Sequence, residues 1–161
     1  MSEFYTEHAD LYRAVADDRD FPSEVRSMIN PTRAEGSTFV ELFAGPAYHC
    51  AAARAAAPDV TTIAIDTSAE MRRVAAASDA AHHYFVGDAS DVLRCLPATA
   101  HVVCVPRYSI VLISEYAVGV LFNAVRRTLA PGGTFFLEVH PDSATGDNMP
   151  VMGVWENLDI H

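Results

Sequence analysis

Lysine is absent from this chain of 161 residues, so arginine supplies all 11 of its strongly basic side chains. Aspartate and glutamate together number 21, which gives a formal net charge of −10 at neutral pH. A protein that binds nucleic acid needs a basic surface to neutralise phosphates. The charge therefore argues against a nucleic-acid partner.

Cysteine is also scarce. Cys50, Cys95 and Cys104 are odd in number and lack the spacing of a metal site, so we expect small buried apolar side chains in a reducing compartment. The adjacent residues His82 and His83 would point to opposite faces of a strand. We therefore expect no metal site.

Long apolar runs are missing as well. No run approaches the roughly 18 residues of a membrane span, and the acidic N-terminus lacks the basic-then-apolar layout of a signal peptide. We therefore expect a cytoplasmic protein that does not bind membranes. Half of the residues are apolar and a fifth are charged, which is typical of a globular protein, and the length suits one domain with a substantial core.

Glycine is sparse at the turn where a phosphate cradle would need it. The apolar segment 38–43 runs into Ala44-Gly45-Pro46-Ala47, which holds one glycine where the dinucleotide fingerprint G-x-G-x-x-G holds three. A second apolar segment follows and ends at Asp66. This order predicts the first βαβ unit of a nucleotide-binding sheet. The single glycine favours a nucleoside without phosphates, such as S-adenosylmethionine, over NAD.

Periodicity and turn residues predict an alternation of helices and strands along the rest of the chain. We expect two helices within residues 3–29, strands at 38–43, 60–65, 82–86, 101–105 and 134–139, and helices at 46–57, 68–76, 90–93 and 114–129. Strands that are apolar nearly throughout, each separated by a helix, indicate an α/β fold with a parallel sheet covered on both faces.

Four motifs occur in an order that gives the chain a resemblance to a known family. They are Glu41-Leu42-Phe43-Ala44-Gly45-Pro46-Ala47, Ile65-Asp66-Thr67-Ser68-Ala69-Glu70-Met71, Phe85-Val86-Gly87-Asp88-Ala89 and Leu129-Ala130-Pro131-Gly132-Gly133-Thr134-Phe135-Phe136-Leu137-Glu138. With them the chain resembles the class I S-adenosylmethionine-dependent methyltransferases over residues 3–140. The opening His8-Ala9-Asp10-Leu11-Tyr12 is similar to small-molecule members such as the amino-sugar N-methyltransferases, although Arg13 stands where these usually have aspartate.

The resemblance implies a Rossmann-like parallel sheet in the order 3-2-1-4-5 with helices on both faces. Residues 1–140 would form the methyltransferase domain, with a helical lid at 1–30, and residues 141–161 an irregular tail. The activity would be transfer of a methyl group from S-adenosylmethionine to a nitrogen or oxygen of a small metabolite, in natural-product biosynthesis, with S-adenosylhomocysteine as product.

The resemblance also implies the residues of the cofactor site. Asp66 would accept hydrogen bonds from both ribose hydroxyls, and Glu41 would favour the methionyl ammonium. The other expected cofactor-binding residues are Tyr12, Ala44, Gly45, Thr67, Met71, Gly87, Asp88, Ala89 and Val105. Three of these residues have a plainer alternative: Asp66 can cap the following helix, Asp88 can cap a turn, and Tyr12 can belong to the core.

Two residues are candidates for catalysis. Tyr108 follows the fourth strand, where the reacting methyl group would lie, and His140 follows the fifth and could act as a base or be merely solvated. Two other functions remain open. One is a non-catalytic subunit that supports an active partner, which Ala47 and the short C-terminus favour. The other is an NAD-dependent oxidoreductase, which is disfavoured because this chain lacks the glycine fingerprint of such enzymes.

The end of the chain leads to a further expectation. The family's sheet usually continues beyond the fifth strand with a helix and an antiparallel hairpin, and the remaining sequence holds too little apolar periodic sequence for that unit. The strand 134–139 would then expose an unpaired apolar edge, a hazard for aggregation. We expect a second chain to cover it, in a homodimer or a heteromer, although the tail could fold back with Val151, Val154 and Trp155.

Overall fold

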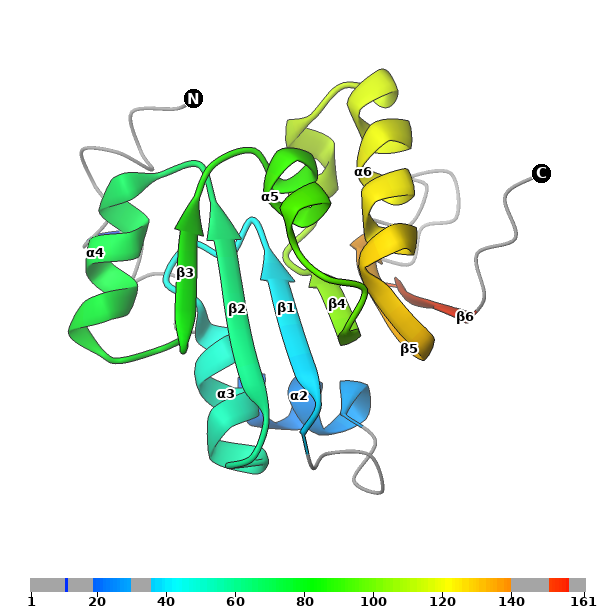
Figure 1. The fold of residues 1–161 in the computed structure, drawn as a ribbon. Coiled ribbons are helices and arrows are strands. Elements are labelled where there is room, and N and C mark those ends of the chain that lie inside the picture. Colours follow the sequence, from blue (N-terminus) through cyan, green and yellow to red (C-terminus); the bar gives the residue numbers. More distant parts are fainter. Residues whose placement is uncertain (1–10, 12–18, 30–35, 140–150, 157–161) are drawn as a thin grey trace.

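The computed structural model describes residues 11, 19–29 and 36–139, and the backbone of residues 151–156. Its centre is a six-stranded sheet in the order β3-β2-β1-β4-β5-β6 (Figure 1). The strands are β1 (Thr38–Leu42), β2 (Thr61–Asp66), β3 (His83–Val86), β4 (Ala100–Val105), β5 (Leu129–Val139) and β6 (Val151–Glu156). The first five are parallel, so the predicted order 3-2-1-4-5 is confirmed.

Helices cover both faces of the sheet, as predicted. They are α2 (Phe21–Met28), α3 (Tyr48–Ala56), α4 (Ala69–Ala77), α5 (Ala89–Cys95) and α6 (Glu115–Thr128), with a short 3-10 helix η3 (Ser109–Leu112) before α6. Hydroxyl side chains fix two of the helix starts, because Ser68 accepts a hydrogen bond from the Met71 amide and Ser114 from the Ala117 amide.

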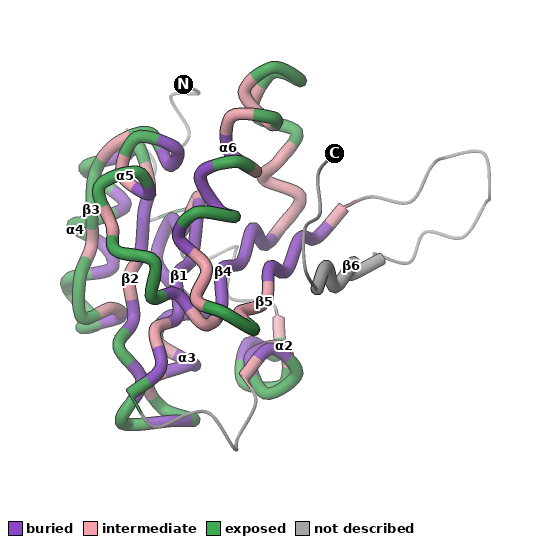
Figure 2. The backbone as a smooth tube through the Cα atoms, turned by 45° about the vertical axis from the view of Figure 1, so that its right-hand side comes forward, coloured by how far each residue is buried: buried purple, intermediate pink, exposed green. Residues whose placement is uncertain are grey.

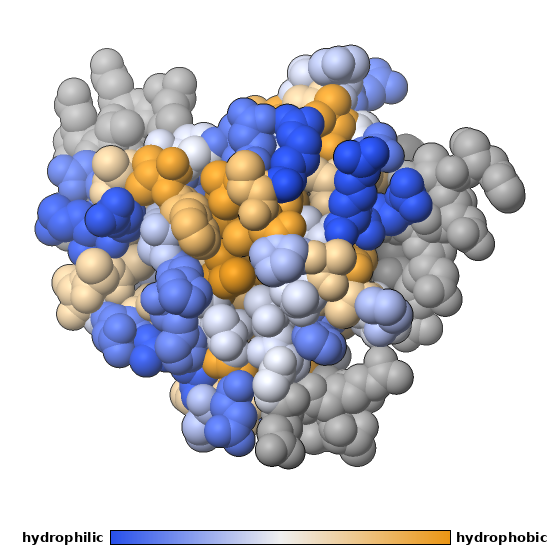
Figure 3. Space-filling model, viewed as in Figure 1, coloured by the Kyte–Doolittle hydropathy of each residue, from blue (hydrophilic) through white to orange (hydrophobic). Residues whose placement is uncertain are grey.

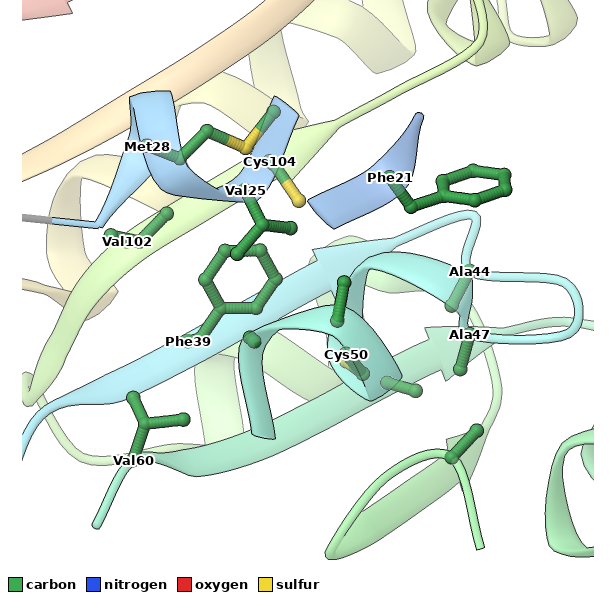
Figure 4. Close-up of a cluster of buried hydrophobic side chains, with 14 of the residues drawn as sticks. Phe21, Val25, Met28, Phe39, Ala44, Ala47, Cys50, Val60, Val102 and Cys104 are labelled. Atoms are coloured by element: carbon green, nitrogen blue, oxygen red, sulfur yellow. The ribbon is translucent and has the colours of Figure 1, made fainter. Parts of the chain in front are cut away.

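The core has two layers, because neighbouring strand residues point to opposite faces. Phe39 of β1 packs with α2 and α3, and Figure 4 shows Val25 and Met28 of α2 on its side of the sheet. The next residue, Val40, packs with α5 and α6 on the other side. Figure 2 shows the buried backbone concentrated in the central strands.

The short helix α5 leaves part of its face of the sheet uncovered. Phe85 of β3, which lies on this face, is 40% exposed. Figure 3 shows apolar side chains gathered in the middle of this side of the molecule. No helix in the described part of the chain is long and apolar enough to cross a membrane.

Two of the three cysteines are buried as predicted. Cys50 and Cys104 lie inside the core, and burial raises the pKa of each thiol well above its usual value. The prediction is wrong for Cys95, which is exposed. Cys95 ends α5, whose buried side consists of Ala89, Ser90 and Leu93. Among the described residues, no group of three His, Cys, Asp or Glu side chains is placed to hold a metal ion.

The fifth strand begins earlier than the predicted residue 134. Strand β5 already begins at Leu129, which pairs with Ala100, and the register then shifts before Val102 pairs with Thr134. A side chain at Gly133 would come within 2.7 Å of the Ala100 carbonyl oxygen. The glycine therefore allows the strand to continue past a close approach to β4.

The prediction that β5 has an unpaired edge is wrong. Strand β6 pairs with it antiparallel, from Thr134 opposite Glu156 to Val139 opposite Val151. The alternative in which the tail folds back is thus the observed backbone arrangement. The apolar edge of β5 needs no second chain to complete its hydrogen bonds.

Candidate functional site

The turn between β1 and α3 lies at the carboxyl edge of the parallel strands (Figure 1). Its φ angles are positive at Phe43 (53°), Gly45 (52°) and Ala47 (59°). Only glycine adopts such angles without steric cost, so two residues of the turn are held in a costly conformation. The Ala44 amide donates to the Ile65 carbonyl at 3.0 Å, which ties the turn to β2.

Asp66 ends β2 directly beside this turn. Its Oδ2 accepts a hydrogen bond from the Gly45 amide and its Oδ1 from the Ser68 amide, each at 2.8 Å. Burial raises the pKa of Asp66, against the opposing effect of these amides and that of Thr67. Asp66 therefore does contact the start of the next helix, and it also fixes the turn after β1.

Tyr84 is a site residue that the sequence did not reveal. Its hydroxyl reaches from β3 to donate to the Gly45 carbonyl at 2.7 Å. Gly45 is thus held on both sides, through its amide by Asp66 and through its carbonyl by Tyr84. The one available signal was strand alternation, which separates Tyr84 from Phe85 and places it on the face of α3.

The end of β3 joins the same edge. The Gly87 amide donates to the Asp66 carbonyl at 2.9 Å, and Asp88 caps α5 by accepting from the Ser90 and Asp91 amides at 2.9 and 3.2 Å. A side chain at Gly87 would meet that of Val92 at 3.2 Å, so the position is crowded. Asp88 thus plays a capping role in this structure.

The remaining predicted residues differ in exposure. Thr67 is exposed at the edge of the sheet, whereas Met71 and Val105 are each 1% exposed, and Ala44 and Ala89 are buried. Their expected contacts with a cofactor remain predictions. Tyr12 and His140 lie outside the described residues.

Glu41 is 2% exposed and bonded entirely within the protein. Its Oε1 lies 2.9 Å from His49 Nδ1, and its Oε2 accepts from the Cys50 amide at 2.9 Å. The other ring nitrogen of His49, Nε2, lies 3.0 Å from Glu24 of α2. The expected role of Glu41 toward a ligand ammonium remains a prediction.

His49 is a buried cation between these two carboxylates. Burial alone would lower its pKa, but the charge of Glu41 and the hydrogen bonds to Glu24 and Glu41 outweigh it and raise the pKa to about 9. The imidazole is therefore protonated at neutral pH, and both ring nitrogens donate.

Arg19 continues the same series of contacts. Its Nε donates to Glu24 at 2.7 Å, and its Nη1 lies 3.0 and 2.9 Å from the two oxygens of Glu138 on β5. Glu138 in turn accepts from the Arg107 amide at 2.7 Å. We call the five side chains Glu41, His49, Glu24, Arg19 and Glu138 the charge chain.

Tyr108 follows β4 in an unusual backbone conformation. Both Arg107 and Tyr108 have a φ of 56°. Burial, followed by the charge of Glu138 and a hydrogen bond to it, raises the pKa of the Tyr108 phenol. The loop that carries this candidate catalytic residue is thus tied to the end of β5.

The comparisons with known proteins identify the fold. The sugar N-methyltransferase KedS8 of a Streptoalloteichus species superposes with a TM-score of 0.65 at 23% identity, over 84% of this chain and 55% of that one. The glycopeptide N-methyltransferase MtfA, solved with S-adenosylmethionine, superposes with a TM-score of 0.62 at 19% identity, over 88% of this chain and 68% of that one. The fold is that of S-adenosylmethionine-dependent methyltransferases.

A further match to this methyltransferase fold comes from a complex between the Haloferax volcanii Trm112 methyltransferase activator and a methyltransferase. It has a TM-score of 0.65 and 23% identity, over 83% of this chain and 57% of that one. This chain thus spans little more than half the length of KedS8 and of the Haloferax match. No family model matches the sequence, and no curated protein matches it.

Proposed function

We propose that the chain binds S-adenosylmethionine at the carboxyl edge of its sheet and transfers the methyl group to a nitrogen or oxygen of a small molecule, which leaves S-adenosylhomocysteine. The observation that carries the proposal is the carboxylate of Asp66, fixed at the end of β2 by the amides of Gly45 and Ser68. The methyltransferase fold supports it, because ligands of open parallel sheets bind at this edge.

The residues present fit the cofactor. A carboxylate has about four acceptor positions. Gly45 and Ser68 each donate an amide to one oxygen of Asp66, and the Thr67 amide also acts on this carboxylate, which leaves at least one acceptor position for the ribose hydroxyls. Because the amides fix the carboxylate before any ligand arrives, little ordering cost remains for the binding step. Gly45 and Ala44 would lie under the methionyl part, and Met71 and Asp88 beside the adenine.

The chain's own residues need to orient the two reactants and exclude water from them more than they need to activate either one. When bound, S-adenosylmethionine supplies a methyl group on a positively charged sulfur, which is already a good leaving group. Orientation and exclusion of water can then supply most of the acceleration. The raised pKa of Tyr108 keeps its phenol protonated. Because that proton is donated to Glu138, Tyr108 would hold the acceptor group by accepting a hydrogen bond on its phenol oxygen, and would not remove a proton.

A second candidate function is that of a subunit that works with another chain. It is favoured by one of the matched structures, because that methyltransferase was solved in complex with an activator protein. Ala47 adds to this, since it holds a left-handed conformation that suits glycine. Light scattering distinguishes the two candidates: a monodisperse monomer that methylates an acceptor unaided contradicts the subunit function.

Isothermal titration calorimetry with S-adenosylhomocysteine tests the proposed cofactor. We expect micromolar affinity for S-adenosylhomocysteine and no heat of binding with NADH. Binding of NADH instead, or of neither compound to the folded chain, would contradict the proposal.

A further inference from the structure

The charge chain connects two places that lie apart in the sequence and on different strands. It runs from Glu41 at the end of β1, through His49 of α3 and Glu24 of α2, to Arg19 and then Glu138 near the end of β5. With His49 protonated, the signs alternate along its whole length. Each of the three interior side chains therefore lies between two neighbours whose charge is opposite to its own.

Both ends of the charge chain hold backbone amides beside the proposed site. At one end, Glu41 accepts from the Cys50 amide in the first turn of α3, just after the turn that Asp66 fixes. At the other end, Glu138 accepts from the Arg107 amide. Arg107 and Tyr108 are two consecutive non-glycine residues with positive φ. Such a conformation persists only where the surroundings hold it.

Burial makes the members of the charge chain depend on one another. The side chains of His49 and Glu41 are each 2% exposed, and that of Glu138 is 6% exposed. Arg19 and Glu24, between them, are 22% and 18% exposed. Removing one partner of a buried ion pair leaves the other charge uncompensated, which is strongly destabilising locally. Loss of Arg19 would thus affect Glu138 and Glu24 together.

We propose that Arg19 is a positioning residue for the methyl transfer, acting through Glu138 on the loop that carries Tyr108. Glu24 and His49 hold Arg19 in turn, so the charge chain is a strut between the turn after β1 and the loop after β4. The functional part of this inference rests on the proposed function, because it treats the loop as the acceptor end of the site.

Hydrogen exchange of the ligand-free protein tests the strut. The readout is the exchange rate of the loop amides at 107–112, compared with the amides of α6. We expect Arg19→Met to accelerate loop exchange by roughly tenfold or more, as for the loss of charge-assisted hydrogen bonds, with a smaller change in α6. Arg19→Lys keeps the charge and should restore part of the protection.

A variant further along the charge chain shows whether the whole charge chain holds the loop, or only the contact between Arg19 and Glu138. Glu24→Gln removes the charge between Arg19 and His49 without touching the loop, and we expect it to accelerate loop exchange as well. The matched control is Arg94→Met, because Arg94 forms an exposed ion pair with Asp91 on α5. This control should leave the loop unchanged.

Two results would overturn the inference. One is an equal acceleration of the loop and of α6 in Arg19→Met, which would make Arg19 a contributor to global stability only. The other is a loop in Glu24→Gln that exchanges as in the wild type. Should Arg19→Met fail to fold, Arg19→Lys and Glu24→Gln decide between the same outcomes. Because no ligand is present, a failure of S-adenosylhomocysteine to bind would contradict the proposed function separately.

Discussion

Asp66 bonds to the fold through both of its carboxylate oxygens, which accept the amides of Gly45 and Ser68. A carboxylate has about four acceptor positions, so these two bonds do not by themselves exclude a ligand. The predicted capping and ribose-binding roles are therefore compatible. A carboxylate that ends a strand beside a small-residue turn is a pattern that the sequence displays directly.

We expect Asp66→Ala to weaken the binding of S-adenosylhomocysteine by roughly 2 kcal/mol or more, since hydrogen bonds to a charged acceptor contribute about 1.5–3 kcal/mol. Calorimetry measures the change, and circular dichroism checks the fold. Asp59→Ala is the matched control, because Asp59 is exposed in the connection before β2. Wild-type affinity in a folded Asp66→Ala protein would reject the ribose role.

Ala47 carries a prediction about backbone strain. Its left-handed conformation costs roughly 1–2 kcal/mol, whereas loss of its buried methyl group costs about 0.8 kcal/mol. We expect Ala47→Gly to leave the free energy of unfolding close to that of the wild type. Ala53→Gly, equally buried but inside α3, loses both helix propensity and packing, about 2 kcal/mol in all. Urea unfolding measures both variants. An equal loss of unfolding free energy in the two would show that the backbone of Ala47 is not strained.

Other residues of the site could not be predicted, because their partners are distant in sequence. Tyr84 meets Gly45 across 39 positions, and Arg19 meets Glu138 across 119. Neither spacing nor periodicity records such contacts. His49 lies two residues after the first motif, yet its position between Glu41 and Glu24 depends on how α2 packs against α3.

At the scale of elements, helix α2 is docked by both apolar and ionic contacts. Phe21 stacks on Tyr48 with ring centroids 4.8 Å apart and meets the edge of His49 at 5.1 Å. Glu24 adds the hydrogen bond to His49. The sequence predicted this helix from its periodicity, but not the face on which it packs.

The docking of α2 predicts a pH dependence of stability. The pKa of His49 rises from 6.5 to about 9 on folding, so its contribution is fully present below pH 6.5 and is lost as the pH rises through 9. The loss is on the order of 3 kcal/mol, at 1.36 kcal/mol per unit of pKa. Urea unfolding between pH 6.5 and 9.5 measures it.

The variant His49→Gln provides the control for that titration. It should be less stable than the wild type at pH 6.5 and should lose less stability as the pH rises. A wild-type free energy of unfolding that stays constant over this range would show that His49 does not gain a proton on folding.

At the scale of the whole molecule, the strand order was predictable and the end of the sheet was not. Each apolar strand, small turn and helix has a local signature, and parallel strands joined by helices admit few arrangements. The tail carries weaker signals, with glycine, proline and polar residues around a short apolar stretch. Its pairing with β5, from Thr134 opposite Glu156 to Val139 opposite Val151, is not marked by any such local pattern.

Removal of residues 151–161 tests the role of β6 in the whole molecule. The edge of β5 from Thr134 to Val139, with buried residues at 135–138, would lose its pairing partner. We expect the shortened chain to associate or aggregate with increasing concentration, because an unpaired apolar edge recruits other strands. Light scattering that finds the shortened and full chains equally monodisperse would contradict a protective role.

The most direct test of the central claim is a crystal structure of the chain with S-adenosylhomocysteine. We expect the nucleoside to lie at the carboxyl edge of β1 and β2, with both ribose hydroxyls within hydrogen-bonding distance of the Asp66 carboxylate, roughly 2.5–3.0 Å. A ligand bound elsewhere, or a ribose that leaves Asp66 in contact with Gly45 and Ser68 alone, would contradict it.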